Sequence, residues 1–232
     1  MFGSESSLHN DKQPLRADLS DRIAQLQQTL PAAVKLVAVS KSVGVDQMRR
    51  AYAAGIRDFG ENRVQSAVEK KQQLADLPNL TWHFIGHLQT NKARLALETF
   101  DWIHSVDNLK LAQRLQSLTV DLPQPPRLLL QVKMLPDPNK YGWSSSELFN
   151  DLAQLLQCDR LAIQGLMTIL PLGLTDVEQL AAFNQMTQLA QAIHQQTAIP
   201  MTQLSMGMSD DYLLAVQAGA TMVRLGRILF SE

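Results

Sequence analysis

Lys35-Leu36-Val37-Ala38-Val39-Ser40-Lys41 is a short apolar segment that runs directly into a lysine. A β-branched run of this length predicts a strand that is buried on both faces, as in a parallel sheet. An amphipathic helix is predicted before it, because apolar residues recur there at spacings of three and four and Pro31 follows them. These residues are Leu15, Leu19, Ile23, Leu26 and Leu30.

The same alternation of helix and strand continues along the chain. Further strands are predicted at 57–60, 81–85, 101–105, 128–134, 161–168, 203–206 and 222–225. Helices are predicted at 46–55, 61–77, 87–97, 109–118, 145–156, 176–195 and 210–218. Eight βα units predict an α/β fold, a single closed (β/α)8 TIM barrel with an extra N-terminal helix. An open doubly wound sheet is the alternative, weakened because no Gly-rich dinucleotide motif follows the first strand.

Composition limits the class of protein. The 232 residues are 45% hydrophobic and 19% charged, with a formal net charge of −1, so neither disorder nor a general attraction to nucleic acid or an anionic membrane is expected. The single cysteine, Cys158, excludes an intramolecular disulfide and a multi-cysteine metal site. No apolar core of a signal peptide begins the sequence, and the apolar stretch 161–174 is too short to cross a bilayer. We expect a cytoplasmic protein.

Active sites of such barrels lie at the C-terminal ends of the strands. Lys41 directly follows the first strand, and a lysine in a partly desolvated barrel mouth has a lowered pKa and can form a Schiff base with a carbonyl compound. A surface lysine in a loop is the alternative. At other strand ends, helix capping is the alternative to a site role for Glu61, Asn62 and Ser105, and none of them is specific alone. For His83 in mid-strand, a buried hydrogen bond is favoured over a catalytic role.

The last two strand ends carry small residues suited to an anion. Segments 204–211 (LSMGMSDD) and 224–227 (RLGR) follow the seventh and eighth strands, where barrels commonly bind phosphate. Simple helix capping by Ser209 is the alternative, and Asp210 and Asp211 must point away from any phosphate. With Lys41, these loops predict a site for a phosphorylated carbonyl compound.

Six segments in order resemble the pyridoxal phosphate homeostasis protein family, whose barrel is similar to the N-terminal, fold type III barrel of alanine racemase. They are 37–41 (VAVSK), 58–62 (DFGEN), 82–92 (WHFIGHLQTNK), 165–168 (GLMT), 204–212 (LSMGMSDDY) and 222–226 (MVRLG).

The resemblance implies a cofactor, pyridoxal 5′-phosphate (PLP), held as a covalent aldimine on Lys41, with Arg224 facing the pyridine nitrogen. It implies that the other cofactor-binding residues are Asn62, which lines the pocket, and the phosphate ligands Ser205, Ser209 and the backbone of Gly226 and Arg227. Arg227 stands where the family has Thr or Ser, so a hydroxyl ligand is lost and an arginine charge is expected in its place. The loop 133–142 (KMLPDPNKYG) also departs from the family pattern at 133–139, although Lys140 and Gly142 still fit.

By resemblance, residues 1–232 form one PLP-binding barrel domain with a flexible tail at 1–12, and the protein serves intracellular PLP (vitamin B6) and amino-acid homeostasis with no or negligible catalysis. An arginine beside the pyridine nitrogen disfavours its protonation and weakens the ring as an electron sink.

A weak PLP-dependent amino-acid racemase or decarboxylase is the alternative, since Tyr141 and Tyr212 lie near strand ends. A third possible function is that of a Schiff-base aldolase that uses Lys41 without a cofactor. We expect a monomer whose partners are PLP and either PLP-dependent apoenzymes or a regulatory protein, and we expect no nucleic acid, membrane or metal.

Overall fold

The computed structural model describes residues 18–231; the predicted tail at 1–12 and Leu15 of the predicted first helix lie outside the described residues. Eight parallel strands close into a barrel in chain order, with β1 paired to β8. The strands are β1 (Lys35–Val39), β2 (Asp58–Glu61), β3 (Thr81–Phe84), β4 (Trp102–Val106), β5 (Arg127–Gln131), β6 (Ala162–Met167), β7 (Gln203–Ser205) and β8 (Met222–Leu225). The predicted (β/α)8 barrel is confirmed.

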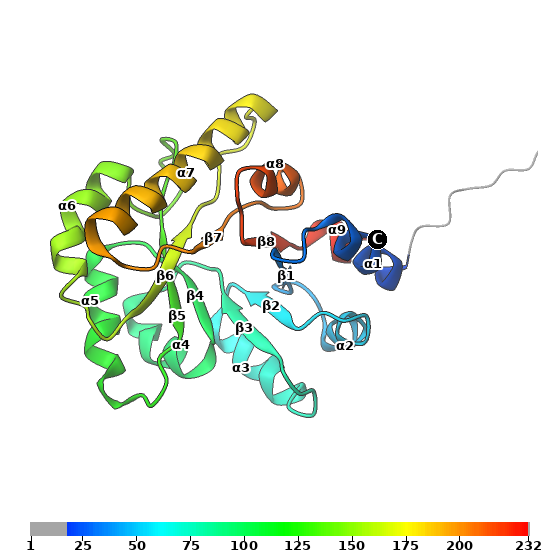
Figure 1. Ribbon diagram of the computed structural model, residues 1–232. Helices are drawn as coiled ribbons and strands as arrows, with labels where there is room; N and C mark the ends of the chain where they lie inside the picture. The colour runs from blue at the N-terminus through cyan, green and yellow to red at the C-terminus, as the bar shows by residue number, and fades with distance from the viewer. Residues whose placement is uncertain (1–17, 232) are drawn as a thin grey trace, which may run out of the picture.

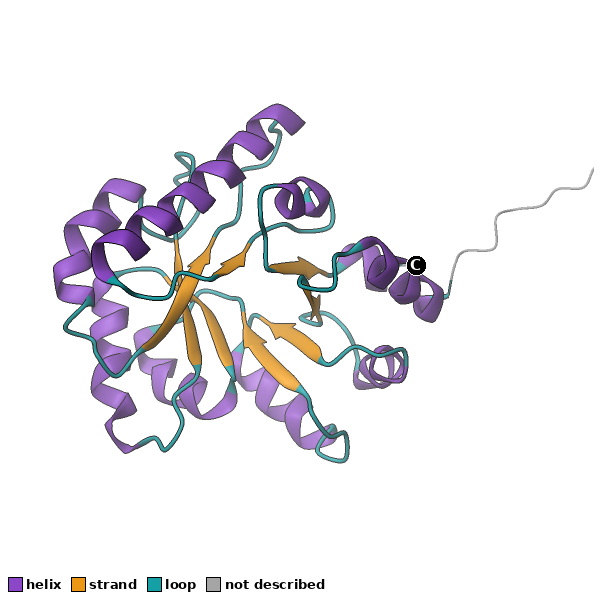
Figure 2. Ribbon diagram, viewed as in Figure 1, coloured by secondary structure: helices purple, strands orange, loops and turns teal. Residues whose placement is uncertain are grey.

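Helices surround the strands on the outside of the barrel (Figure 2). They are α1 (Leu19–Thr29), α2 (Val45–Ala53), α3 (Val64–Gln73), α4 (Ala93–Thr99), α5 (Leu109–Leu118), α6 (Ser145–Leu155), α7 (Asp176–Thr197), α8 (Tyr212–Gln217) and α9 (Arg227–Phe230). Two short 3-10 helices, η1 (Thr90–Lys92) and η2 (Thr119–Asp121), join them. Helix α1 lies beside α9, close to the C-terminus (Figure 1).

Side-chain alternation along the strands divides the core in two. Outward residues such as Phe59 and Ile103 pack against the helices. A smaller apolar cluster, Trp102, Leu129, Met167 and Met222, comes from β4, β5, β6 and β8. A polar side chain lies beside this cluster: the buried His83 ring stacks on Trp102 at a centroid distance of 6.0 Å.

Several predicted boundaries were wrong. Glu61, assigned to a helix, is the last residue of β2, and α3 begins only at Val64. The fifth strand ends at Gln131 rather than at 134. Ser105 lies inside β4, and Asn108 caps α5 instead by accepting a hydrogen bond from the Leu111 N–H. The short helix α9 was not predicted. Within residues 18–231, no helix combines the length and apolar character needed to cross a membrane.

Candidate functional site

A cavity of about 540 Å³ opens where the first and last strands of the barrel end. It is lined by Lys41 after β1, by Met208, Ser209 and Asp210 after β7, and by Arg224, Gly226 and Arg227 at the end of β8. Residues separated by more than 180 positions meet here because β1 and β8 are neighbours in the closed barrel.

Five of the seven predicted binding residues share this cavity: Lys41, Ser209, Arg224, Gly226 and Arg227. The other two are not among the residues that line it. Asn62 is exposed after β2, where its backbone lies against Gly86. Ser205 is completely buried in the barrel interior. Gln47 and Phe230 also line the cavity and were not predicted from the sequence.

Lys41 is exposed at the rim of this cavity. The expectation of a partly desolvated lysine was therefore wrong: Val39 is the last residue of β1, so Lys41 lies one residue beyond Ser40 in the following turn, where solvent reaches it. Lys41 nevertheless shares the cavity with Gly226.

The segment beneath Lys41 is fixed by a buried charge. Ser40 and Glu61 are completely buried, and the Ser40 hydroxyl donates to Glu61 Oε1 at 2.6 Å. Lys70 Nζ on α3 donates to the same Glu61 oxygen at 2.7 Å and to the Ser40 carbonyl at 2.7 Å. Two strand ends and one helix are thereby joined directly below the lysine.

The loop after β7 folds back on itself and reaches α9. Gly207 adopts φ of 90°, and a Cβ there would lie 2.6 Å from Ala215 Cβ, so only glycine fits without strain. The Met208 N–H donates to Asp211 Oδ1 at 2.6 Å. The Ile228 N–H donates to Ser209 Oγ at 3.3 Å, which links this loop to the one after β8.

Asp210 lines the cavity, although both acids of this loop were expected to point away from it. Its carboxylate pairs with the Arg227 guanidinium, and both side chains are exposed. Its charge is thus offset by Arg227. Asp211 is engaged within its own loop.

Arg224 places a buried positive charge at the inner wall of the cavity. It donates from one terminal nitrogen to the carbonyl and hydroxyl oxygens of Ser205, both at 2.7 Å, and from the other to the Thr168 carbonyl at 2.8 Å. Burial lowers the pKa of Arg224 to about 10, although the nearby Asp211 carboxylate acts in the opposite direction. The guanidinium is therefore charged at neutral pH.

A buried hydrogen-bonded chain continues from Ser205 through the barrel. Ser205 Oγ lies 2.8 Å from His104 Nδ1, and His104 Nε2 lies 2.9 Å from His83 Nδ1. His83 Nε2 lies 2.8 Å from Asp58 Oδ1, which also accepts a hydrogen bond from Lys35 at 2.9 Å. The prediction of a hydrogen-bonded interior His83 is confirmed.

Burial makes this chain sensitive to acid. It lowers the pKa of His83, despite the opposing charges of Asp58 and Asp101, and it lowers the pKa of His104 well below the usual range, with the charge of Arg224 acting in the same direction. Burial alone would raise the pKa of Asp58, but hydrogen bonds from His83 and Lys35 outweigh it, and the pKa is lowered.

We expect the free energy of unfolding to fall as the pH drops below the ordinary histidine value of 6.5. Below that pH the unfolded chain binds protons that the folded chain excludes. The contribution of the two neutral rings to the free energy of unfolding is therefore full above pH 6.5 and is lost as the pH falls toward their lower folded-state pKa. The slope is up to about 1.4 kcal/mol per pH unit for each ring. Urea unfolding at several pH values between about 5 and 8 measures this slope. His104→Asn should flatten it, and equal slopes in the variant and the parent would contradict the assignment.

The remaining candidates lie away from the cavity. His87 Nδ1 lies 2.9 Å from Asp107 Oδ2, and its ring stacks on the exposed Tyr141 at 3.6 Å between centroids. Tyr212 begins α8 and is half-buried. Neither tyrosine is among the residues that line the cavity.

Comparison with known proteins agrees with this geometry. The family described as "Alanine racemase, N-terminal domain" matches residues 16–232. The pyridoxal phosphate homeostasis protein of Synechocystis is 50% identical over 209 residues, which cover 90% of this chain and 96% of that protein. The chain belongs to the pyridoxal phosphate homeostasis protein family. Another member, from Escherichia coli K12, is 37% identical over 228 residues, which cover 92% of this chain and 96% of that protein.

Solved structures give the same family and fold. PipY of Synechococcus elongatus, in a structure described as having PLP bound, has a TM-score of 0.89 and 50% identity, covering 92% of this chain and 100% of that one. An alanine racemase of Clostridium difficile has a TM-score of 0.76 at 13% identity, covering 93% of this chain and 56% of that one, which shows a shared fold alone.

Proposed function

We propose that this protein binds PLP reversibly in the 540 Å³ cavity and serves PLP homeostasis rather than catalysis. The observation that carries the proposal is the meeting of Lys41, Arg224 and the loops around Ser209 and Gly226 in one cavity. Its volume lies within the range of small-molecule and cofactor sites. The family membership supports the same ligand, since its relatives carry PLP homeostasis in their names and PipY is described with PLP bound.

The chemistry of the lining residues fits each part of PLP. The Lys41 amine is suited to form a Schiff base with the aldehyde. The Arg224 guanidinium, a donor with no acceptor atom, suits an unprotonated pyridine nitrogen. The Ser209 hydroxyl and the backbone N–H groups of Gly226 and Arg227 suit the phosphate, as glycine lets the backbone approach closely. Asn62 and Ser205 are not part of this proposal, because neither lines the cavity.

A carrier role is supported by the charge on Arg224. With its pKa near 10, the guanidinium is positive at neutral pH and disfavours protonation of an adjacent pyridine ring. An unprotonated ring is a poor electron sink for a substrate carbanion. Among the described residues that line the cavity, none is a histidine, cysteine or tyrosine that would exchange a substrate proton.

The visible absorption spectrum tests this proposal. Added PLP is expected to give the wild-type protein the yellow colour of a Schiff base, and free amino acids are expected to shift the spectrum by exchanging with Lys41. Lys41→Ala should remove the colour without loss of folding, because the side chain is exposed. Lys41→Arg is the matched control, since it keeps the charge but cannot form a Schiff base. A colourless wild type, or Lys41-dependent turnover of amino acids, would contradict the proposal.

We infer a cytoplasmic monomer that exchanges PLP with apoenzymes or with a regulatory protein. The near-neutral formal charge of −1 supports a small-molecule ligand over a nucleic acid. Sedimentation of the full chain, with and without PLP, tests the monomer.

A further inference from the structure

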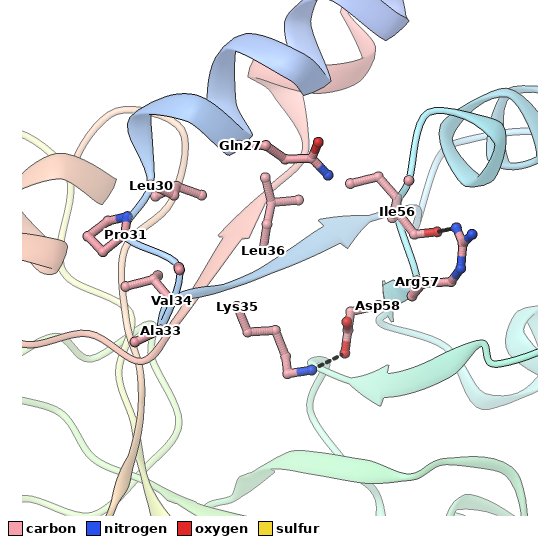
Figure 3. Close-up of a pocket in the computed structure, with 12 residues that line it drawn as sticks. Gln27, Leu30, Pro31, Ala33, Val34, Lys35, Leu36, Ile56, Arg57 and Asp58 are labelled. Carbon is pink, nitrogen blue, oxygen red and sulfur yellow. Dashed lines mark hydrogen bonds and ion pairs between the residues drawn. The ribbon is translucent and has the colours of Figure 1, made fainter.

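A second cavity, of about 460 Å³, lies at the opposite end of the barrel, where β1 and β2 begin (Figure 3). Lys35 and Asp58 line it, and Figure 3 shows the hydrogen bond from the lysine amine to the carboxylate. Asp58 is also the last member of the buried chain that begins at Arg224. One continuous path of hydrogen bonds therefore joins the cavity at one end of the barrel to the cavity at the other.

The charged groups at both ends of this path determine on which atoms its hydrogens lie. An arginine can only donate, and an ionised carboxylate can only accept. The pKa of Asp58 is lowered, so it is ionised at neutral pH, and His83 must present its Nε2–H to it. Since burial keeps the His83 ring neutral, its Nδ1 carries no hydrogen and must accept from His104 Nε2.

The position of the Ser205 hydroxyl hydrogen follows in the same way. His104 is neutral with its hydrogen on Nε2, so its Nδ1 must accept the single hydroxyl hydrogen of Ser205. Ser205 Oγ in turn accepts from Arg224. The reverse order would place the lone pair of His83 against the Asp58 carboxylate, or would require a buried imidazolium, and both are costly.

We propose that the hydrogen bonds run in one direction, from Arg224 through Ser205, His104 and His83 to Asp58, and that Ser205 and His104 are positioning residues that hold the Arg224 guanidinium at the ligand cavity. Ser205 has no hydrogen left to donate to a phosphate. It acts on the ring end of the ligand through Arg224, whereas Ser209 acts on the phosphate end. This part of the inference rests on the proposed function; the direction of the chain does not.

The direction is measured by ¹⁵N–¹H correlation spectroscopy of the histidine side chains in the full chain without PLP. Both buried rings are expected as neutral Nε2–H tautomers near neutral pH. His9→Gln, His87→Gln and His194→Gln assign the signals of the other three histidines. Asp58→Asn removes the fixed acceptor, because an amide also donates, so a population of His104 with its hydrogen on Nδ1 should appear. Wild-type His104 carrying a hydrogen on Nδ1, a charged His83, or an unchanged tautomer in Asp58→Asn would overturn the inference.

Binding of PLP and of pyridoxal, which lacks the phosphate, tests the positioning role. Ser205→Ala should raise the dissociation constant of both ligands by the same factor, about three- to tenfold, because it loosens Arg224 at the ring. Ser209→Ala, the comparison variant, should weaken PLP alone. A loss confined to PLP in Ser205→Ala would make Ser205 a phosphate ligand and overturn the inference, as would no loss for either compound. If the wild type binds neither ligand, the proposed function and the positioning role both fail, while the spectroscopy still decides the direction.

Discussion

Lys70→Met is expected to lower the free energy of unfolding by about 3–5 kcal/mol, the usual result of removing one partner of a buried ion pair. Glu61 is completely buried, and Lys70 is its cationic partner, at 2.7 Å. Among residues 18–231, Glu61 Oε2 has no hydrogen-bond partner, so the Ser40 hydroxyl is the other group that compensates the carboxylate. The variant also leaves the Ser40 carbonyl without the Lys70 donor, directly before Lys41.

Urea unfolding of two further variants separates this cause from a general loss of packing. Adding Glu61→Gln to Lys70→Met removes the uncompensated charge and should restore most of the stability. Arg49→Met breaks an exposed pair with Asp76 and should change stability little. If Lys70→Met were no more destabilising than Arg49→Met, the buried pair would not support the strand ends as described.

Gly165→Ala is expected to lower the free energy of unfolding by at least about 4 kcal/mol or to prevent folding. The added methyl group would clash with backbone atoms, which cannot move away as a flexible side chain can. A Cβ at Gly165 would lie 1.8 Å from the Gln203 carbonyl oxygen of β7. Gly165 follows a register shift between β5 and β6, where Leu128 pairs with Ile163 but Leu129 pairs with Gly165. Glycine at such an irregularity permits close approach of the next strand.

Gly44→Ala is the matched control for this substitution. Gly44 precedes α2 at φ of −73°, and a Cβ there meets no atom within 4 Å. Urea unfolding should show a cost below about 1 kcal/mol for this variant. Similar costs for the two variants would show that β6 and β7 tolerate a side chain between them, against the observed geometry.

The strands were predictable because burial on both faces leaves a plain trace in the sequence. The apolar run Leu36–Val39 and its counterparts can only be stable between layers of other apolar residues. Their ends were less predictable, because polar residues there have two explanations. Glu61 looked like a helix cap, yet its carboxylate is held by Lys70, a residue nine positions away whose contact no local pattern reveals.

The cavity residues were predictable from their place at strand ends, as Lys41 and Gly226 show. The family resemblance assigned Ser205 to the phosphate, whereas in the structure Ser205 ends β7 and its hydroxyl lies 2.8 Å from His104 Nδ1 in the barrel interior. The five side chains of the buried chain come from β2, β3, β4, β7 and β8, and only closure of the barrel brings them together. An inward polar residue in mid-strand, such as His83, is the one signal that could have indicated them.

We propose that the amine after β1 and the loops after β7 and β8 form one PLP site. Borohydride reduction of the PLP-loaded full chain, followed by mass-spectrometric mapping of the modified peptides, identifies the lysine that binds PLP. We expect one pyridoxyl group, on Lys41, and we expect excess inorganic phosphate to slow its formation. A pyridoxyl group on another lysine, or labelling spread over surface lysines and unaffected by phosphate, would contradict it.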